Sequence, residues 1–302
     1  MGILAHVDAG KTSLTERLLF AAGAIDQLGR VDDGTTQTDA LALERRRGIT
    51  IRSAVASFVT GDVAVNLIDT PGHPDFIAEV ERVLAVLDGA ILVISAVEGV
   101  QAQTRVLMRA LRRLGIPTVI FLNKIDRRGA DIGRTLTGIA EKLTPAVVVL
   151  GSVDRPGTRQ ASFIQHSGTD HVFASELHAL LAERDEGLLA DYLDDRNVPF
   201  DRLYWHLARQ IAQGLICPVF GGSALTGSGV SALASGIQEL LPSSSEDRDG
   251  IFIGRVFEIE RSPAGEKVAF VRMFTGVLQA RRALPGAWPV TVSAGRGEPG
   301  MT

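Results

Sequence analysis

The chain has 302 residues, more than one ordinary hydrophobic core requires, and this length suggests two or three domains. Hydrophobic residues make up 45% and charged residues 22%, so the composition is that of a globular protein that can fill its cores. The net charge of -4, from 31 basic and 35 acidic side chains, excludes nucleic-acid binding through a global positive field and leaves only local patches for such contacts.

Cys217 is the single cysteine, so we expect neither a disulfide-linked partner nor a cysteine-cluster metal site. No apolar run reaches membrane-spanning length, and the first residues lack a basic segment followed by a signal-type core. We therefore expect no membrane partner and a cytoplasmic location.

The first predicted elements are a short apolar strand, a loop of small residues over Ala5–Thr12, and a helix with leucines on one face. Backbone N–H groups at such a helix start face an anion, and Lys11 adds a full positive charge. Thr12 offers a hydroxyl to Mg²⁺. The segment predicts a phosphate-binding loop, although Ala5 replaces the usual first glycine. The alternative is a chance Gly-Lys-Thr helix start.

A polar segment from residue 24 to about 47 follows this helix, and then Gly48-Ile49-Thr50-Ile51. Two strands are expected at 52–60 and 63–68, and the second leads into Asp69-Thr70-Pro71-Gly72-His73. The next residues, 74–87, have the spacing of a helix.

Continuous apolar runs at 90–94 and 118–122 are typical of strands buried on both faces. A helix is expected between them, at about 103–114. Asn123-Lys124-Ile125-Asp126 follows the second of these strands.

The pattern of strand and helix returns with a last core strand at 217–220, which ends at Gly221-Gly222-Ser223-Ala224 before a helix at about 230–241. This alternation predicts an α/β fold, a mostly parallel sheet with helices on both faces. Ligands of such sheets gather at the carboxyl ends of the strands, and each motif named above falls at one.

We predict that residues 1–241 form the first domain, with an inserted subdomain at about 144–199. Inside the insertion we expect a strand-like run at 146–150 and a helical stretch around 175–192, and the helix at 203–211 follows it.

Residues 242–250 form a linker by composition, and 251–302 are expected to begin an all-β barrel domain. A barrel does not close from so few strands, and the residues from about 281 are rich in Ala, Gly, Pro and Arg. We therefore expect an incomplete barrel and a chain that is one portion of a longer protein.

The motifs occur in one order, and each has a separate chemical role toward a nucleotide. Asp69 would hold Mg²⁺ through water, and the Gly72 N–H would contact the γ-phosphate. Thr50 would complete the metal shell only when that phosphate is present. These residues, with Thr12, predict a magnesium-dependent triphosphate site.

The last two motifs predict a guanine pocket. Asp126 can accept both N–H donors of the guanine edge, which adenine does not display. Asn123 would brace the base and the phosphate loop, with the Lys124 stem along the ring plane. Ser223 and Ala224 would present backbone groups to the guanine oxygen.

With these motifs the chain resembles the translational GTPases of the elongation factor G group, from about Gly2 to Leu278. Arg47-Gly48-Ile49-Thr50-Ile51 and Asp69-Thr70-Pro71-Gly72-His73 carry the likeness, together with Ala5 in place of glycine and the inserted subdomain. The resemblance implies GTP and GDP as ligands, Mg²⁺ as cofactor, and GTP hydrolysis stimulated by the ribosome. It also implies that His73 orients the attacking water; the alternative is a polar residue at a helix start.

Within that group, the chain is most similar to tetracycline-resistance ribosomal protection proteins. The segments that indicate this are Gly34-Thr35-Thr36-Gln37-Thr38-Asp39, Leu43-Glu44-Arg45-Arg46-Arg47-Gly48 and Val100-Gln101-Ala102-Gln103-Thr104-Arg105. Elongation factor G proper typically has tryptophan where Ala40 stands. The resemblance implies release of tetracycline from the ribosome at the expense of GTP, through further domains that this chain does not contain.

The implied partner is the ribosome, through RNA and proteins near its factor-binding site. Two alternatives stay open: an elongation-type translocation factor with no resistance role, and a nucleotide-binding remnant with no useful activity. Because the further domains are absent, we expect the 302-residue chain to bind guanine nucleotides without conferring resistance.

The expected site residues fall into three overlapping sets. The catalytic set is Lys11, Thr50 and His73, and the metal set is Thr12, Thr50 and, through water, Asp69. The nucleotide-binding set is Ala5, His6, Val7, Asp8, Ala9, Gly10, Lys11, Thr12, Ser13, Asp69, Gly72, Asn123, Lys124, Asp126, Ser223, Ala224 and Leu225.

Three further features have two interpretations each. Val7 and Ile49 form either an apolar gate beside His73 or ordinary core packing. Asp8 either helps to hold a monovalent cation, as the resemblance implies, or caps its loop. Four arginines on one side of a predicted helix form either a solvated face or a ribosomal contact; they are Arg105, Arg109, Arg112 and Arg113.

Overall fold

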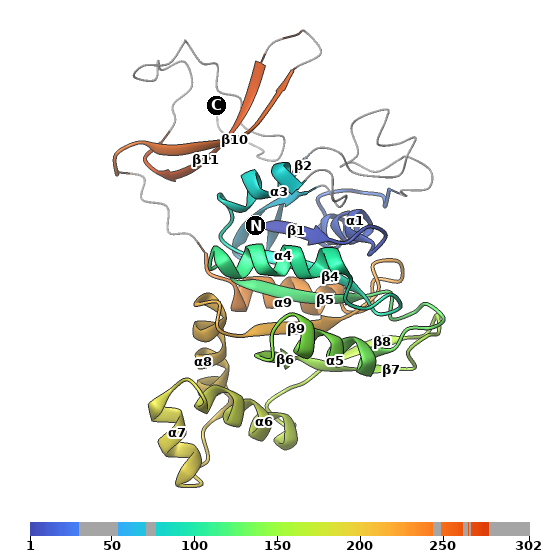
Figure 1. Ribbon diagram of the computed structural model, residues 1–302, viewed down its shortest axis with the longest axis vertical. Helices are drawn as coiled ribbons and strands as arrows, with labels where there is room; N and C mark the ends of the chain where they lie inside the picture. Colours follow the sequence, from blue (N-terminus) through green and yellow to red (C-terminus); the bar gives the residue numbers. More distant parts are fainter. Residues whose placement is uncertain (30–53, 71–76, 244–248, 262–264, 266, 278–302) are drawn as a thin grey trace.

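The computed structural model describes residues 1–29, 54–70, 77–243, 249–261, 265 and 267–277. Within these residues the main sheet has seven strands (Figure 1). In spatial order they are β2 (Ala54–Thr60), β3 (Val63–Asp69), β1 (Gly2–Ala5), β4 (Ala90–Ser95), β5 (Thr118–Asn123), β9 (Cys217–Gly221) and β6 (Val147–Val149). β2 is antiparallel to β3, and all other neighbours are parallel. The predicted α/β fold is confirmed.

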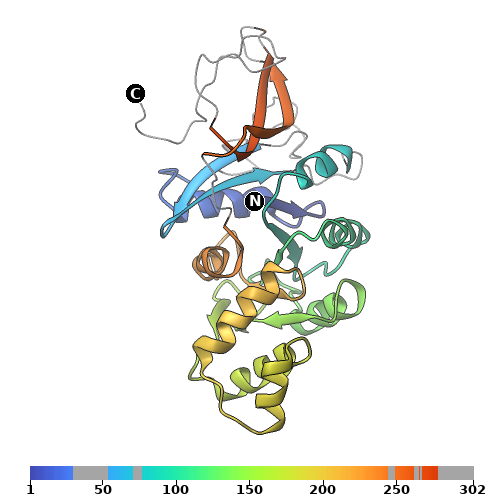
Figure 2. The same cartoon turned by 90° about the vertical axis from the view of Figure 1, so that its left-hand side faces the viewer.

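Helices cover both faces of this sheet (Figure 2). One face carries α1 (Lys11–Ala21), α8 (Phe200–Ala212) and α9 (Val230–Leu240), and the other carries α3 (Ile77–Leu84), α4 (Ala102–Arg113) and α5 (Ile132–Lys142). Successive residues of a strand point to opposite faces, so β4 supplies both cores. Ile91 packs on the α1 and α9 side, and Leu92 on the α4 side.

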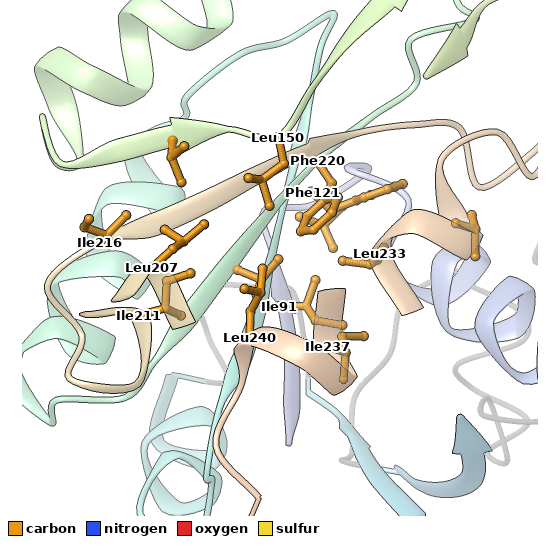
Figure 3. Close-up of a cluster of buried hydrophobic side chains, with 14 of the residues drawn as sticks. Ile91, Phe121, Leu150, Leu207, Ile211, Ile216, Phe220, Leu233, Ile237 and Leu240 are labelled. Carbon is orange, nitrogen blue, oxygen red and sulfur yellow. The ribbon is translucent and has the colours of Figure 1, made fainter. Parts of the chain in front are cut away.

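The larger core lies between the sheet and the helices α8 and α9 (Figure 3). Phe121 of β5 and Phe220 of β9 are fully buried, and Leu233 and Ile237 of α9 pack in the same cluster. Burial of each such side chain contributes about 1.5–3 kcal/mol relative to exposure. This packing fixes β9 beside β5, and therefore holds together the loops that follow these two strands.

α5 is absent from the elements expected from the sequence. Its residues include Gly133 and Gly138 and two threonines, which lower helix propensity and obscure the pattern. The helix forms because Asp131 caps it, accepting a hydrogen bond from the Arg134 N–H at 2.9 Å, and because Ile139 is fully buried.

The predicted insertion differs from expectation in two ways. The run at 146–150 contains β6, which pairs with β9 and extends the main sheet. The stretch at 175–192 is two helices, α6 (His171–Ala182) and α7 (Glu186–Leu193), because Asp185 caps a new helix start. Its carboxylate accepts hydrogen bonds from the N–H groups of Gly187 and Leu188, at 3.0 and 3.1 Å. A small hairpin of β7 (Gly151–Asp154) and β8 (Ser162–Gln165) precedes them.

An antiparallel hairpin follows in the described residues after 249, formed by β10 (Ile253–Arg261) and β11 (Lys267–Thr275). Phe257 of this hairpin is buried in a cluster with Val83 of α3, and Arg272 pairs with Asp88 through two hydrogen bonds of 2.6 and 2.8 Å. The hairpin therefore packs against α3 and the residues that follow it. Of the helices that the structure describes, none has both the length and the apolarity needed to cross a membrane.

Candidate functional site

The loop between β1 and α1 has the backbone geometry of an anion cradle. Asp8 and Gly10 both lie in the left-handed region, with φ of 63° and 90°, so the chain turns back on itself before α1 begins at Lys11. Gly10 is the N-cap and has no side chain that could compete for the first-turn N–H groups. A Cβ at Gly10 would overlap Nδ2 of Asn123. The position therefore requires glycine, and the helix start suits a phosphate.

His6 is buried in this loop as a neutral imidazole. Its Nδ1 donates to the carbonyl of Val7 at 2.8 Å, and its Nε2 accepts from the N–H of Ser95 at 3.5 Å. Burial lowers the pKa of His6 below its ordinary value, since desolvation disfavours the charged form. Protonation would also remove the acceptor that faces Ser95. His6 thus ties the loop to the end of β4.

Lys11 and Asp69 form a buried ion pair at the carboxyl ends of β1 and β3. Lys11 Nζ donates to Asp69 Oδ1, and the two side chains are 7% and 0% exposed. The second oxygen, Asp69 Oδ2, is buried without a hydrogen-bond partner among the described residues. Mg²⁺ is typically held by one or two carboxylates together with waters and substrate phosphates. The carboxylate of Asp69, whose second oxygen is unpartnered among the described residues, fits such a site.

Asn123 connects the phosphate loop to the loop that follows β9. Its Nδ2 donates to the carbonyl of Ala9 at 2.8 Å, and its Oδ1 accepts from the N–H of Ala224 at 2.9 Å. The side chain is 3% exposed, so both bonds are shielded from water. One residue thereby fixes the distance between the anion cradle and the 223–225 loop.

Asp126 and Lys124 lie beside this bridge. Asp126 is 7% exposed, and Lys124 has a left-handed backbone with φ of 65°. The adjoining Ile125 N–H donates to the carbonyl of Gly222 at 3.2 Å, which joins the turn after β5 to the end of β9. Ser223 is fully buried. The structure therefore brings the carboxylate, the ammonium stem and the 223–225 loop to one edge of the sheet.

Two positioning residues were not predicted from the sequence. Arg17 of α1 donates to the carbonyl of Ala224 at 2.9 Å and to that of Leu225. Glu98 accepts from Lys124 Nζ at 3.2 Å. Neither residue belongs to a sequence motif. Their partners are distant in the chain, so nothing in the sequence indicated these contacts.

Several of the expected residues are exposed to solvent, and others lie outside the described part of the chain. Val7 is 38% exposed, which does not agree with ordinary core packing, and Asp8, Ser13 and Leu225 are also exposed. Thr50, Gly72 and His73 lie outside the described residues, as does Ile49.

The chain is similar to known proteins over most of its length. Residues 1–243 match the family model described as the elongation factor Tu GTP binding domain. The oxytetracycline resistance protein of Streptomyces rimosus is 56% identical over 283 residues, which cover 93% of this chain and 43% of that protein. The tetracycline resistance protein TetM of Streptomyces lividans is 50% identical over 290 residues, covering 94% and 45%.

A crystal structure of a protein from Thermus thermophilus matches with a TM-score of 0.82 at 28% identity, over 93% of this chain and 46% of that one. This chain spans less than half the length of the two resistance proteins named above.

Proposed function

The chain belongs to the elongation factor Tu GTP binding domain family and is a guanine-nucleotide-binding GTPase domain, and on this basis we propose that it hydrolyses GTP on the ribosome with Mg²⁺ as cofactor. The observation that carries the proposal is the Asn123 bridge between Ala9 and Ala224. Through its two hydrogen bonds, the Asn123 side chain would hold the phosphate-binding loop and the base-binding loop at a fixed separation.

The phosphate end of the proposed site is the turn before α1. The loop Ala5–Gly10 and the first turn of α1, with Thr12 and Ser13, would hold the phosphates through N–H groups, and Lys11 would supply charge. Thr12 and, through water, Asp69 would hold Mg²⁺, which supplies charge stabilisation at the phosphates when bound. The unpartnered Asp69 Oδ2 supports this assignment. Thr50 and Gly72 would complete this end, as the resemblance implies.

The base end of the proposed site selects guanine. Asp126 would accept from the two N–H donors of the guanine edge, while Lys124 lies along the ring and the Ser223–Leu225 backbone faces the guanine oxygen. The burial of Asp126 supports this role, because a carboxylate shielded from water discriminates strongly between matched and mismatched donors.

The hydrolytic step in this proposal depends on His73, which would orient water toward the γ-phosphate. Phosphate release from GTP, measured with and without purified ribosomes, tests it. We expect ribosomes to accelerate release, and His73→Ala to lower the stimulated rate by about 10²-fold or more with GTP affinity nearly unchanged. Equal losses of affinity and rate would show that His73 is structural. An unchanged rate with ribosomes would contradict the ribosomal part of the proposal.

The names of the two resistance relatives support a role in tetracycline resistance. We propose that this role is release of tetracycline from the ribosome in the cytoplasm, with ribosomal RNA and proteins near the factor-binding site as partners. Release of labelled tetracycline from ribosomes, measured with the chain and GTP, tests this role. Release of the drug would show a resistance factor and would contradict the expectation that these 302 residues alone do not confer resistance. GTP hydrolysis on ribosomes with the drug still bound would agree with that expectation.

A further inference from the structure

A basic groove of about 480 Å³ lies between α4 and the end of α5. These two helices cover the same face of the sheet (Figure 2). Five cationic side chains line it, with Met108 and Leu143 at its base; the cations are Arg105, Arg109, Arg112, Arg113 and Lys142. Because the whole chain carries a net charge of -4, this groove is a local reversal of its electrostatic character.

Helix stability does not account for all of these charges. Arg112, Arg113 and Lys142 lie in the last turns of their helices, where cations interact favourably with the helix dipole. Arg105 lies near the start of α4, the end where a cation is disfavoured, and Arg109 repeats the charge four residues later. Like charges at this spacing destabilise a helix, so the two arginines point to a partner that neutralises them.

The described acidic residues do not provide that partner. Helix α4 contains four arginines and no acidic residue. No described acidic side chain forms an ion pair with Arg105 or Arg109. Arg112 differs, because it donates to the carbonyl of Leu143 at 3.2 Å and so closes the base of the groove.

The lining favours a phosphate backbone over a protein segment. Protein interfaces centre on apolar or aromatic anchors, but Met108 and Leu143 are only 2% and 7% exposed and no aromatic side chain lines the groove. Among the described residues that line the groove, there is also no aromatic platform for unpaired bases. Guanidinium groups in a row suit the phosphates of a duplex, which are bound without reading the sequence.

We propose that this groove binds the phosphate backbone of duplex RNA, with Arg105 and Arg109 as its central contacts. This inference rests on the proposed function in one respect: if the chain acts on the ribosome, the RNA is ribosomal. Binding of RNA phosphates by the groove is a property of α4 and α5 and does not require GTP.

The test is fluorescence anisotropy of a labelled short RNA duplex with the full chain, in buffer without nucleotide, over a range of salt concentrations. Arg105→Glu with Arg109→Glu is expected to weaken binding by about tenfold or more. It is also expected to reduce the magnitude of the slope of log affinity against log salt concentration by about two. Replacing both with lysine keeps the charge and is expected to retain most of the affinity.

A matched control is Arg159→Glu with Arg209→Glu, which changes the net charge equally at two exposed sites away from the groove. It is expected to alter binding far less. Equal weakening by both double variants would overturn the proposal, since it would show a general charge effect. Equal competition by polyglutamate and unlabelled duplex would also overturn it, because the groove would then fit an acidic protein. Separate GTP titrations of the same variants should be unchanged, so a failed GTPase proposal would leave the RNA result interpretable.

Discussion

Replacing Asn123 with alanine tests whether one side chain holds the two halves of the site together. The substitution removes two buried hydrogen bonds, to the Ala9 carbonyl and from the Ala224 N–H. Each bond contributes about 1 kcal/mol net, and each partner left buried without a bond costs about 1–3 kcal/mol, less whatever water recovers. We therefore expect a loss of about 2–4 kcal/mol in the free energy of unfolding. In a domain of this size, that loss lowers the melting temperature by roughly 5–15 °C.

The assay is urea and thermal unfolding of the full chain, with GTP titration in parallel. Asn66→Ala is the matched control, because the Asn66 side chain is exposed and accepts one bond, from Ser57 Oγ at 2.7 Å. Its expected cost is within about 0.5 kcal/mol. Asn123→Ala should also weaken GTP binding, since the 223–225 loop loses its tie to the phosphate loop. Unfolding midpoints that match those of the control would refute the bridge as a stabilising element.

Three further predictions concern single residues of the site. Gly10→Ala should destabilise the chain more than Gly23→Ala in thermal unfolding. Both glycines have positive φ, which costs about 1–2 kcal/mol for alanine. Only a Cβ at Gly10 would also meet Asn123, since nothing lies within 4 Å of a Cβ at Gly23. Asp126→Asn should weaken GTP binding by about 1–3 kcal/mol, because an amide donor then faces a guanine donor, and xanthosine triphosphate should bind relatively better; unchanged GTP affinity in titration would move the base pocket elsewhere. His6 has a lowered pKa in the folded chain, so the unfolded chain binds more protons near pH 6, and the free energy of unfolding should fall as the pH drops below about 6.5. In urea unfolding at several pH values, His6→Gln should show a smaller decrease of the midpoint with falling pH than the unchanged chain. An identical decrease would contradict a lowered pKa of His6.

Much of the fold follows from the sequence because the signals are local and strong. Residues 90–94 of β4 and 119–122 of β5 are all apolar and buried, and these runs indicate a parallel sheet in which motifs gather at strand ends. The family resemblance was confirmed for the same reason, since its motifs are contiguous. α5 was missed because two glycines weaken its pattern, and the helical stretch at 175–192 was not divided because the Asp185 cap depends on a single side chain.

The candidate site shows the same contrast between local and distant information. Asn123 could be named from its motif, but its two partners lie 114 and 101 residues away, and only the fold shows them. Arg17 could not be named at all, because its contacts with the 223–225 loop arise where α1 packs near α9. The roles of Thr50, Gly72 and His73 stay predictions from the resemblance.

The central claim is that this chain selects a guanine nucleotide, and calorimetric titration of the purified chain with GTP and with ATP, both with Mg²⁺, tests it most directly. We predict one site for GTP or GDP and at least a hundredfold weaker binding of ATP, about 2.7 kcal/mol, because adenine lacks the two donors that Asp126 accepts. Lys11→Ala should abolish the GTP signal, since it removes the positive charge at the phosphates. Equal affinities for GTP and ATP, or no binding of either, would contradict the account.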